Sequence, residues 1–232
     1  MPQRGPLQWV DGEGWLILSG GGDWQRGETD AVTAHILSIA NLDRPMVVLL
    51  SEGERERGYE LLESYTRLGG PGGEVVILEG AQRQRLNEPR LLTALAEAGI
   101  LHLGGVQPWI LARSLRNTPA LAQILKGYGT LQGLLIVGAE GGAAALGAWI
   151  AGSGQETTTA PGLGLVRSAI IAPQFTTTEE APALRAQLRL HPGFVGLGIP
   201  RGVALALGPQ GQVETWGEGA VTAVVHEEAA ES

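Results

Sequence analysis

The sequence predicts an α/β fold, namely a three-layer α/β/α sandwich with a mostly parallel sheet and antiparallel C-terminal strands. Short apolar runs alternate with helical segments of about 10 to 15 residues, a pattern typical of a parallel sheet covered on both faces. The 36 glycines are spread along the chain and favour many tight turns between strands and helices. The last three expected strands have no helix between them, so we expect them to pair antiparallel. A chain of 232 residues fits one domain, residues 1–232.

In the first half of the chain each expected strand is followed by a helix. Apolar runs predict strands at residues 15–18, 45–50 and 75–78. Helices are predicted over residues 29–40, 52–68 and 87–98. In the second of these helices, Tyr59, Leu62 and Tyr65 recur at core-facing spacing. Asn87 is expected to cap the third helix, with Pro89 in its first turn.

The rest of the chain, from residue 100 onward, contains most of the expected strands. They lie at residues 100–103, 134–137, 165–172, 195–199, 203–207, 213–216 and 221–225. A helical region after residue 107 restarts at the Thr118–Pro119 cap and ends near Gly127. A further helix is expected over 183–190, and the acidic tail from Glu227 is expected to fray.

The stretch from 134 to 150 has the pattern of a strand, a sharp turn and a helix. A buried strand at 134–137 leads into glycines, and the Ala-rich run up to Ile150 predicts a closely packed helix. Enzymes of this design hold a nucleophile on the strained turn, beside backbone N–H groups. The tip of such a turn is Ser or Cys, whereas Glu140 occupies it here.

Composition excludes several classes of function. The chain has no cysteine, which removes disulfides, thiolate catalysis and cysteine-based metal sites. The net charge of −8, with scattered basic residues, argues against nucleic acid and anionic membranes as partners. No apolar run has the length of a signal peptide or a membrane span, so a cytoplasmic location is expected. Neither a cofactor nor a metal site is predicted.

A glycine-rich turn after the first expected strand, residues 19–23, raises the question of phosphate binding. It lacks the third glycine of a dinucleotide fingerprint and the lysine of a P-loop. Nucleotide binding is therefore not expected.

Six short motifs carry a resemblance to a known family. They are Leu101–Gln107, Gly138–Ala144, Gly162–Leu165, Ile170–Phe175, His191–Arg201 and Trp216–Val221. In this order they resemble motifs of the cyanophycinases and α-aspartyl dipeptidases (peptidase E). These are serine hydrolases with a class I glutamine amidotransferase-like fold, and the likeness covers nearly the whole chain.

The resemblance implies a Ser-His-carboxylate triad, which this sequence does not have. Glu140 stands at the serine position, Gln174 at the histidine position and Arg201 at the carboxylate position. A glutamate that attacked an amide would form a mixed anhydride, which is steeply uphill. A glutamine has no proton to exchange near neutral pH, and an arginine cannot accept a hydrogen bond.

The resemblance also implies that part of the binding pocket is retained. Gly105 and Gly141 occupy the positions of the oxyanion-hole N–H groups, next to Gly104, and Gln107 occupies a substrate-contact position. The alternative is that these glycines serve turn geometry only. His102, in the strand that leads to the pocket, is either a relocated base or a buried core histidine.

The sequence leaves two functions open. In the first, the protein is a non-catalytic homologue whose pocket binds a small peptide, an amino acid or an anion, and a homodimer is allowed. In the second, it hydrolyses aspartyl peptides or related amides, with Glu140 or Glu156 activating water. A further hypothesis is that ionised Glu140 fills its own oxyanion hole and Arg201 balances its charge. Two separate solvated charges are the alternative.

Overall fold

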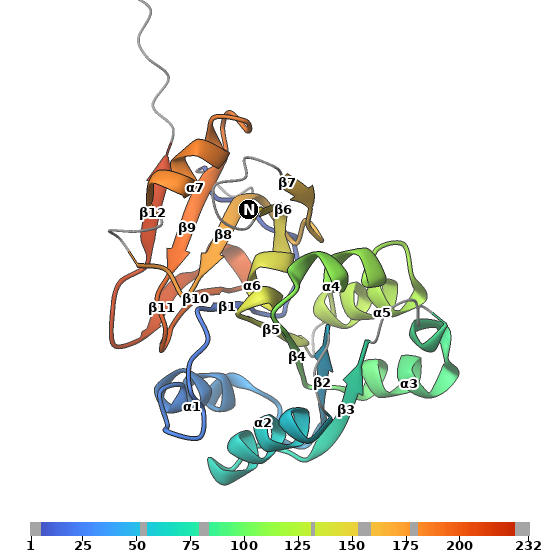
Figure 1. The fold of residues 1–232 in the computed structure, drawn as a ribbon. Helices are drawn as coiled ribbons and strands as arrows, with labels where there is room; N and C mark the ends of the chain where they lie inside the picture. Colours follow the sequence, from blue (N-terminus) through green and yellow to red (C-terminus); the bar gives the residue numbers. More distant parts are fainter. Residues whose placement is uncertain are drawn as a thin grey trace, which may run out of the picture.

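A computed structural model describes residues 6–51, 55–78, 84–130, 133–152, 159–176 and 181–225. Two mixed sheets are flanked by helices, which confirms the predicted α/β fold (Figure 1). The sequence analysis expected one sheet, whereas the strands form two, because β6 to β9 and β12 pair with one another and not with the larger sheet.

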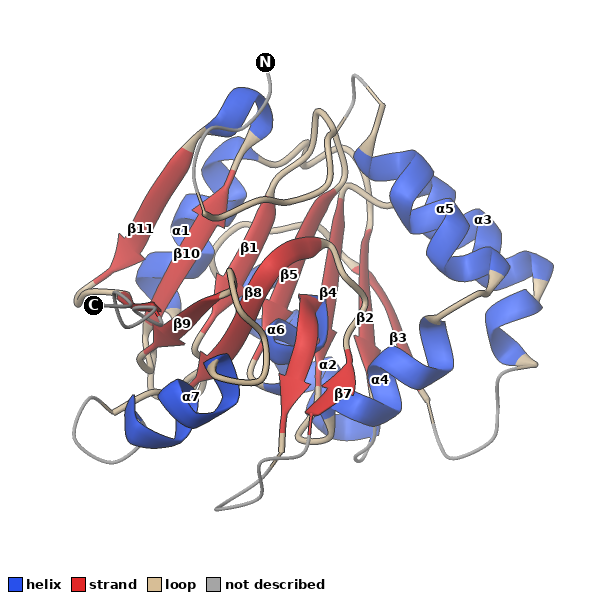
Figure 2. Ribbon diagram, turned by 90° about the horizontal axis from the view of Figure 1, so that it is seen from above, coloured by secondary structure: helices blue, strands red, loops and turns tan. Residues whose placement is uncertain are grey.

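The larger sheet has seven strands and carries the candidate site. Its strands in spatial order are β11 (Val213–Gly217), β10 (Val203–Leu207), β1 (Leu16–Ser19), β5 (Leu135–Ala139), β4 (Ile100–Gly104), β2 (Met46–Leu50) and β3 (Gly73–Ile77). The five strands from β1 to β3 are parallel, whereas β10 and β11 are antiparallel additions at one edge (Figure 2). The carboxyl ends of β1, β5, β4 and β2 therefore meet at one edge of the sheet, where α/β proteins place their ligands.

The smaller sheet contains five strands. They are β12 (Thr222–Val225), β9 (Val195–Ile199), β8 (Val166–Pro173), β6 (Gly147–Ala151) and β7 (Thr159–Pro161). β12 pairs antiparallel with β9, so the expectation that the last three strands pair with one another is correct for β10 and β11 and wrong for β12.

The helix predicted to reach Ile150 is shorter than expected. Helix α6 (Gly141–Leu146) ends at Gly147, whose extended backbone starts β6. Trp149 and Ile150 are residues that favour strands, and pairing with β7 and β8 outweighs continuation of the helix.

Helices cover both faces of the larger sheet. On one face lie α1 (Asp30–Ile39) and α2 (Arg55–Arg67). On the other lie α3 (Pro89–Glu97), α4 (Pro108–Leu115), α5 (Pro119–Tyr128) and α6. Helix α7 (Ala181–Leu188) packs on the smaller sheet, and two short 3-10 turns lie at η1 (Arg85–Asn87) and η2 (Pro209–Gly211).

The central strands are buried on both faces, which is why they appear in the sequence as uninterrupted apolar runs. In β1, Leu16 and Leu18 point into the core shared with α3 to α6, and Ile17 points into the core under α1 and α2. Helix α6 packs against both β5 and β8, so it lies between the two sheets.

Two local expectations fail and one holds. Asn87 ends a 3-10 turn, and Glu88 precedes α3 without a side-chain capping bond. Tyr59 is 47% exposed, although Tyr65 on the same helix is buried as predicted. Thr118 does cap its helix, because its Oγ1 accepts a hydrogen bond from the Leu121 N–H at 3.2 Å.

Candidate functional site

The turn between β5 and α6 places Glu140 in a strained backbone conformation. Its φ is 52° and its ψ is −123°, a region that glycine enters freely and other residues rarely adopt. The N–H of Glu140 donates to the Ser19 carbonyl at 3.2 Å, and its own carbonyl accepts from Ala143 and Ala144. The strained turn of a nucleophile elbow is therefore present, with a glutamate at its tip.

Glycines allow this turn to pack closely against its neighbours. A β-carbon on Gly141 would collide with the Gly105 carbonyl, and one on Gly142 would collide with the Leu103 carbonyl. Gly21, at φ 78°, lies against the Glu140 side chain, whose Oε1 would be 2.9 Å from a β-carbon there. Turn geometry therefore explains these glycines, and a binding role for Gly104, Gly105 and Gly141 stays a prediction.

Glu140 and Gln174 are brought together as the resemblance implies. The Gln174 Nε2 donates to Glu140 Oε1 at 3.3 Å, and Gln174 also has a left-handed backbone, with φ 55°. The Gln174 amide thus contacts the tip residue, and its place corresponds to the histidine position that the resemblance implies.

Arg201 pairs with a residue that the sequence did not single out. Its Nη2 lies 2.8 Å from Glu28 Oε2, and the same oxygen accepts the Asp23 N–H at 2.9 Å. These two contacts, the backbone bond first, lower the pKa of Glu28. Glu28 raises the pKa of Arg201, and the charge of Glu140 adds a smaller effect in the same direction.

A direct ion pair between Glu140 and Arg201, one form of the charge balance that we hypothesised, is not formed, although the charge of Glu140 still raises the pKa of Arg201. Among the described residues, Arg201 pairs with Glu28, and Glu140 forms no ion pair within 4 Å. The Glu140 carboxylate accepts from Gln174 and from neither the Gly105 nor the Gly141 N–H. Gln107 precedes α4 at its N-cap position without a capping bond from its side chain.

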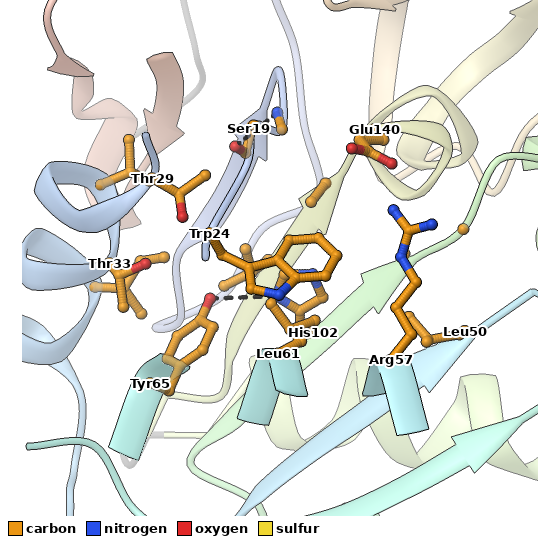
Figure 3. A pocket seen from close by; sticks show the side chains of 18 of the residues that line it. Ser19, Trp24, Thr29, Thr33, Leu50, Arg57, Leu61, Tyr65, His102 and Glu140 are labelled. Atoms are coloured by element: carbon orange, nitrogen blue, oxygen red, sulfur yellow. Dashed lines mark hydrogen bonds between the residues drawn. The ribbon is translucent and has the colours of Figure 1, made fainter. Parts of the chain in front are cut away.

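A cavity of about 280 Å³ opens beside Glu140. It lies between the carboxyl ends of β1, β5, β4 and β2 and the helices α1 and α2. Its apolar lining side chains are Trp24, Val32, Ile36, Leu50, Leu61, Tyr65, Val106, Val137 and Ala139. In Figure 3, Trp24 lies across the centre of the cavity, with Glu140 and Arg57 on one side and Tyr65 and Thr33 on the other.

His102 and Tyr65 form a buried pair in the cavity wall. The Tyr65 hydroxyl and His102 Nδ1 are 3.2 Å apart, and burial lowers the pKa of His102 to about 4. At neutral pH the imidazole is therefore uncharged. Its 6% exposure and its hydroxyl partner fit the predicted buried histidine better than a relocated base.

Arg57, an exposed residue, borders the cavity and contacts Trp24. The guanidinium carbon of Arg57 lies 5.1 Å from the centre of the Trp24 ring, within cation–π range. No local sequence pattern indicated Trp24, Thr33 or Arg57 as site residues, since they come from a loop and two helices that only the fold brings together. Glu156, the other candidate carboxylate, lies outside the described residues.

Within the described ranges, no group of three or more histidine or acidic side chains is placed to hold a metal ion. In the same ranges, no helix is both long and apolar enough to cross a membrane.

Neither a protein-family model nor a curated protein matches this sequence. Two solved structures have a similar fold. A peptidase from an acI-B1 Actinobacterium is 20% identical with a TM-score of 0.68, and the match covers 94% of this chain and 97% of that one. A protein from Listeria monocytogenes EGD-e, provisionally assigned as peptidase E, is 18% identical with a TM-score of 0.60, covering 89% of this chain and 99% of that one. The chain therefore has the fold of peptidases of the peptidase E type.

Proposed function

We propose that this protein is a non-catalytic homologue of the peptidase E-like serine peptidases, which keeps a pocket for a small peptide or amino acid. The observation that carries the proposal is the conformation of Glu140. A strained, glycine-like backbone is retained at the elbow tip, although the side chain there cannot perform the acyl transfer that the elbow serves in serine hydrolases.

The contacts of the three triad positions support loss of the serine route. A proton relay needs a nucleophile, a base that accepts its proton and a group that orients the base. Glu140 already accepts a hydrogen bond from the Gln174 side chain, and an amide cannot act as the base because it neither gains nor loses a proton near neutral pH. Arg201 is a permanent cation engaged by Glu28, so it cannot orient a base as a carboxylate would.

The pocket beside the elbow supports a retained binding role. A concave, mostly apolar cavity with a few polar groups at its mouth is the usual form of a small-molecule site. The cavity includes Glu140 in its wall, so a ligand bound there would touch the degenerate elbow.

Covalent labelling tests the proposal. We expect a fluorophosphonate probe to leave the wild-type protein and the Glu140→Ser variant unmodified, because a lone serine without its base is a poor nucleophile. The triple variant Glu140→Ser, Gln174→His, Arg201→Glu is the positive control for slow labelling. Stoichiometric labelling of the wild type, or of the single variant, would contradict the proposal and would identify His102 as the first base to test.

A further inference from the structure

The cavity beside Glu140 combines an apolar interior with one carboxylate and one guanidinium at its mouth. We propose that it binds an apolar, preferably aromatic, residue with a free α-amino group, either as a free amino acid or as the first residue of a peptide. The side chain enters the cavity, Glu140 binds the ammonium group, and Arg57 binds the carboxylate when one is present. This ligand class rests on the proposed function, and it differs from the aspartyl substrates that the family resemblance implies.

The interior selects an apolar side chain. The cavity is lined by the apolar side chains of Val32, Ile36, Leu61, Val137 and Trp24. An apolar cavity of about 150 Å³ is enough to hold benzene. The 280 Å³ available here has room for a phenyl or indole ring together with the α-carbon and its substituents. An aspartate side chain would lose its hydration in this space without gaining an ionic partner.

Glu140 is placed to bind an ammonium group. Its Oε1 accepts the Gln174 amide, and among the described residues its Oε2 has no hydrogen-bond partner. The nearby cation Arg201 is held by Glu28 at 2.8 Å, so the charge of Glu140 is not neutralised by a direct ion pair. A ligand ammonium would supply that missing partner, with a charge-assisted hydrogen bond.

Arg57 is placed to bind the other charged end of the ligand. Its guanidinium lies over the face of Trp24 and borders the same cavity as Glu140. In the part of the chain that the structure describes, Arg57 has no carboxylate within 4 Å, so its N–H donors remain available for one.

Calorimetric titration with phenylalanine and matched analogues tests the assignment. We expect phenylalanine to bind and N-acetylphenylalanine, which has no ammonium group, to bind at least tenfold more weakly. Alanine and aspartate should also bind at least tenfold more weakly. Phenylalaninamide and the dipeptide Phe-Ala distinguish a free amino acid from the first residue of a peptide as the ligand. Neither compound has a carboxylate on the α-carbon of its phenylalanine, whereas the free amino acid does.

Single substitutions assign each end of the ligand. Glu140→Gln should weaken phenylalanine binding at least tenfold, the loss expected for one charge-assisted hydrogen bond, whereas Glu63→Gln on the exposed face of α2 should leave it unchanged. Because Arg57 binds the carboxylate, the wild-type protein should bind phenylalanine more tightly than phenylalaninamide, which has none. Arg57→Gln should remove this difference, and Arg189→Gln, also exposed, is its control. Thr33→Trp should fill the cavity and abolish binding. Circular dichroism checks that this variant folds, and Glu140→Gln and Arg57→Gln decide the question if it does not.

The possible failures are distinct. Equal binding of phenylalanine and N-acetylphenylalanine, or no loss with Glu140→Gln, would overturn the role of Glu140. Tighter binding of aspartate, or no binding of any analogue, would overturn the apolar ligand class. Cleavage of Phe-Ala that depends on Glu140 would overturn the proposed non-catalytic function and leave the ligand class intact.

Discussion

Replacing Glu140 with glycine should make the protein more stable than replacing it with alanine. Residues other than glycine pay about 1 to 3 kcal/mol in a backbone region such as φ 52°, ψ −123°. Glycine removes this penalty but gives the unfolded chain more freedom, which costs about 0.4 to 1 kcal/mol. Both variants lose the bond to Gln174, so the comparison isolates the backbone. We expect Glu140→Gly to exceed Glu140→Ala by about 0.5 to 2 kcal/mol in free energy of unfolding.

Urea denaturation measures the difference directly, as a shift in midpoint at constant m-value. In thermal unfolding each kcal/mol should appear as about 2 to 4 °C for a chain of this size. Glu63 provides the matched control, because it is exposed within helix α2 and glycine should there be less stable than alanine by about 1 kcal/mol. If Glu140→Gly proved no more stable than Glu140→Ala, the elbow would not be strained and the inference of a retained nucleophile turn would fall.

Three further predictions concern burial, packing and charge. Burial lowers the pKa of His102 from 6.5 to about 4 in the folded state. Between about pH 6.5 and 4, His102 is therefore protonated in the unfolded chain but not in the folded one. Stability should therefore fall by up to about 3 kcal/mol as the pH drops through that range, and urea titrations at pH 7 and 4.5 should show a smaller fall in His102→Gln. Gly142→Ala should lower the melting temperature severely, because its β-carbon would collide with the Leu103 carbonyl of β4. Gly72→Ala is the control and should leave the melting temperature nearly unchanged, because there is open space around Gly72. Equal changes in melting temperature would refute the packing argument. Arg201→Gln should raise the carboxyl pKa of Glu28 measured by NMR, but only in part, since the bond from the Asp23 N–H remains; an unchanged pKa would show that the ion pair is not formed in solution.

Much of the larger sheet could be predicted from the sequence because its strands are buried on both faces. Runs such as Met46–Leu50 and Val203–Leu207 are apolar throughout, and such runs have few alternatives to a central strand. The smaller sheet was harder to predict. The Ala-rich run that leads to Trp149 and Ile150 resembles a continuing helix, and pairing with β7 and β8 makes its end a strand.

The elbow and its neighbours could also be located from local pattern. The glycines next to Glu140 indicate a tight turn from the sequence alone. Gln174 belongs to the motif Ile170–Phe175, which places it directly after β8. The partner of Arg201 could not be found in this way. Glu28 lies 173 positions away in the chain, in the loop before α1, and no sequence periodicity links the two. The cavity wall is likewise assembled from separate elements, so Trp24 and Arg57 gave no local signal.

The measurement that tests the central claim most directly is the recovery of intact peptide after incubation with the protein, followed by liquid chromatography and mass spectrometry. The panel should contain aspartyl dipeptides and Phe-Ala, each run beside the Glu140→Gln variant. A non-catalytic pocket predicts that every peptide is recovered intact, at the level of a protein-free control. Product that accumulates with wild-type protein and disappears with Glu140→Gln would show that the carboxylate at the elbow is catalytic, and would contradict the account.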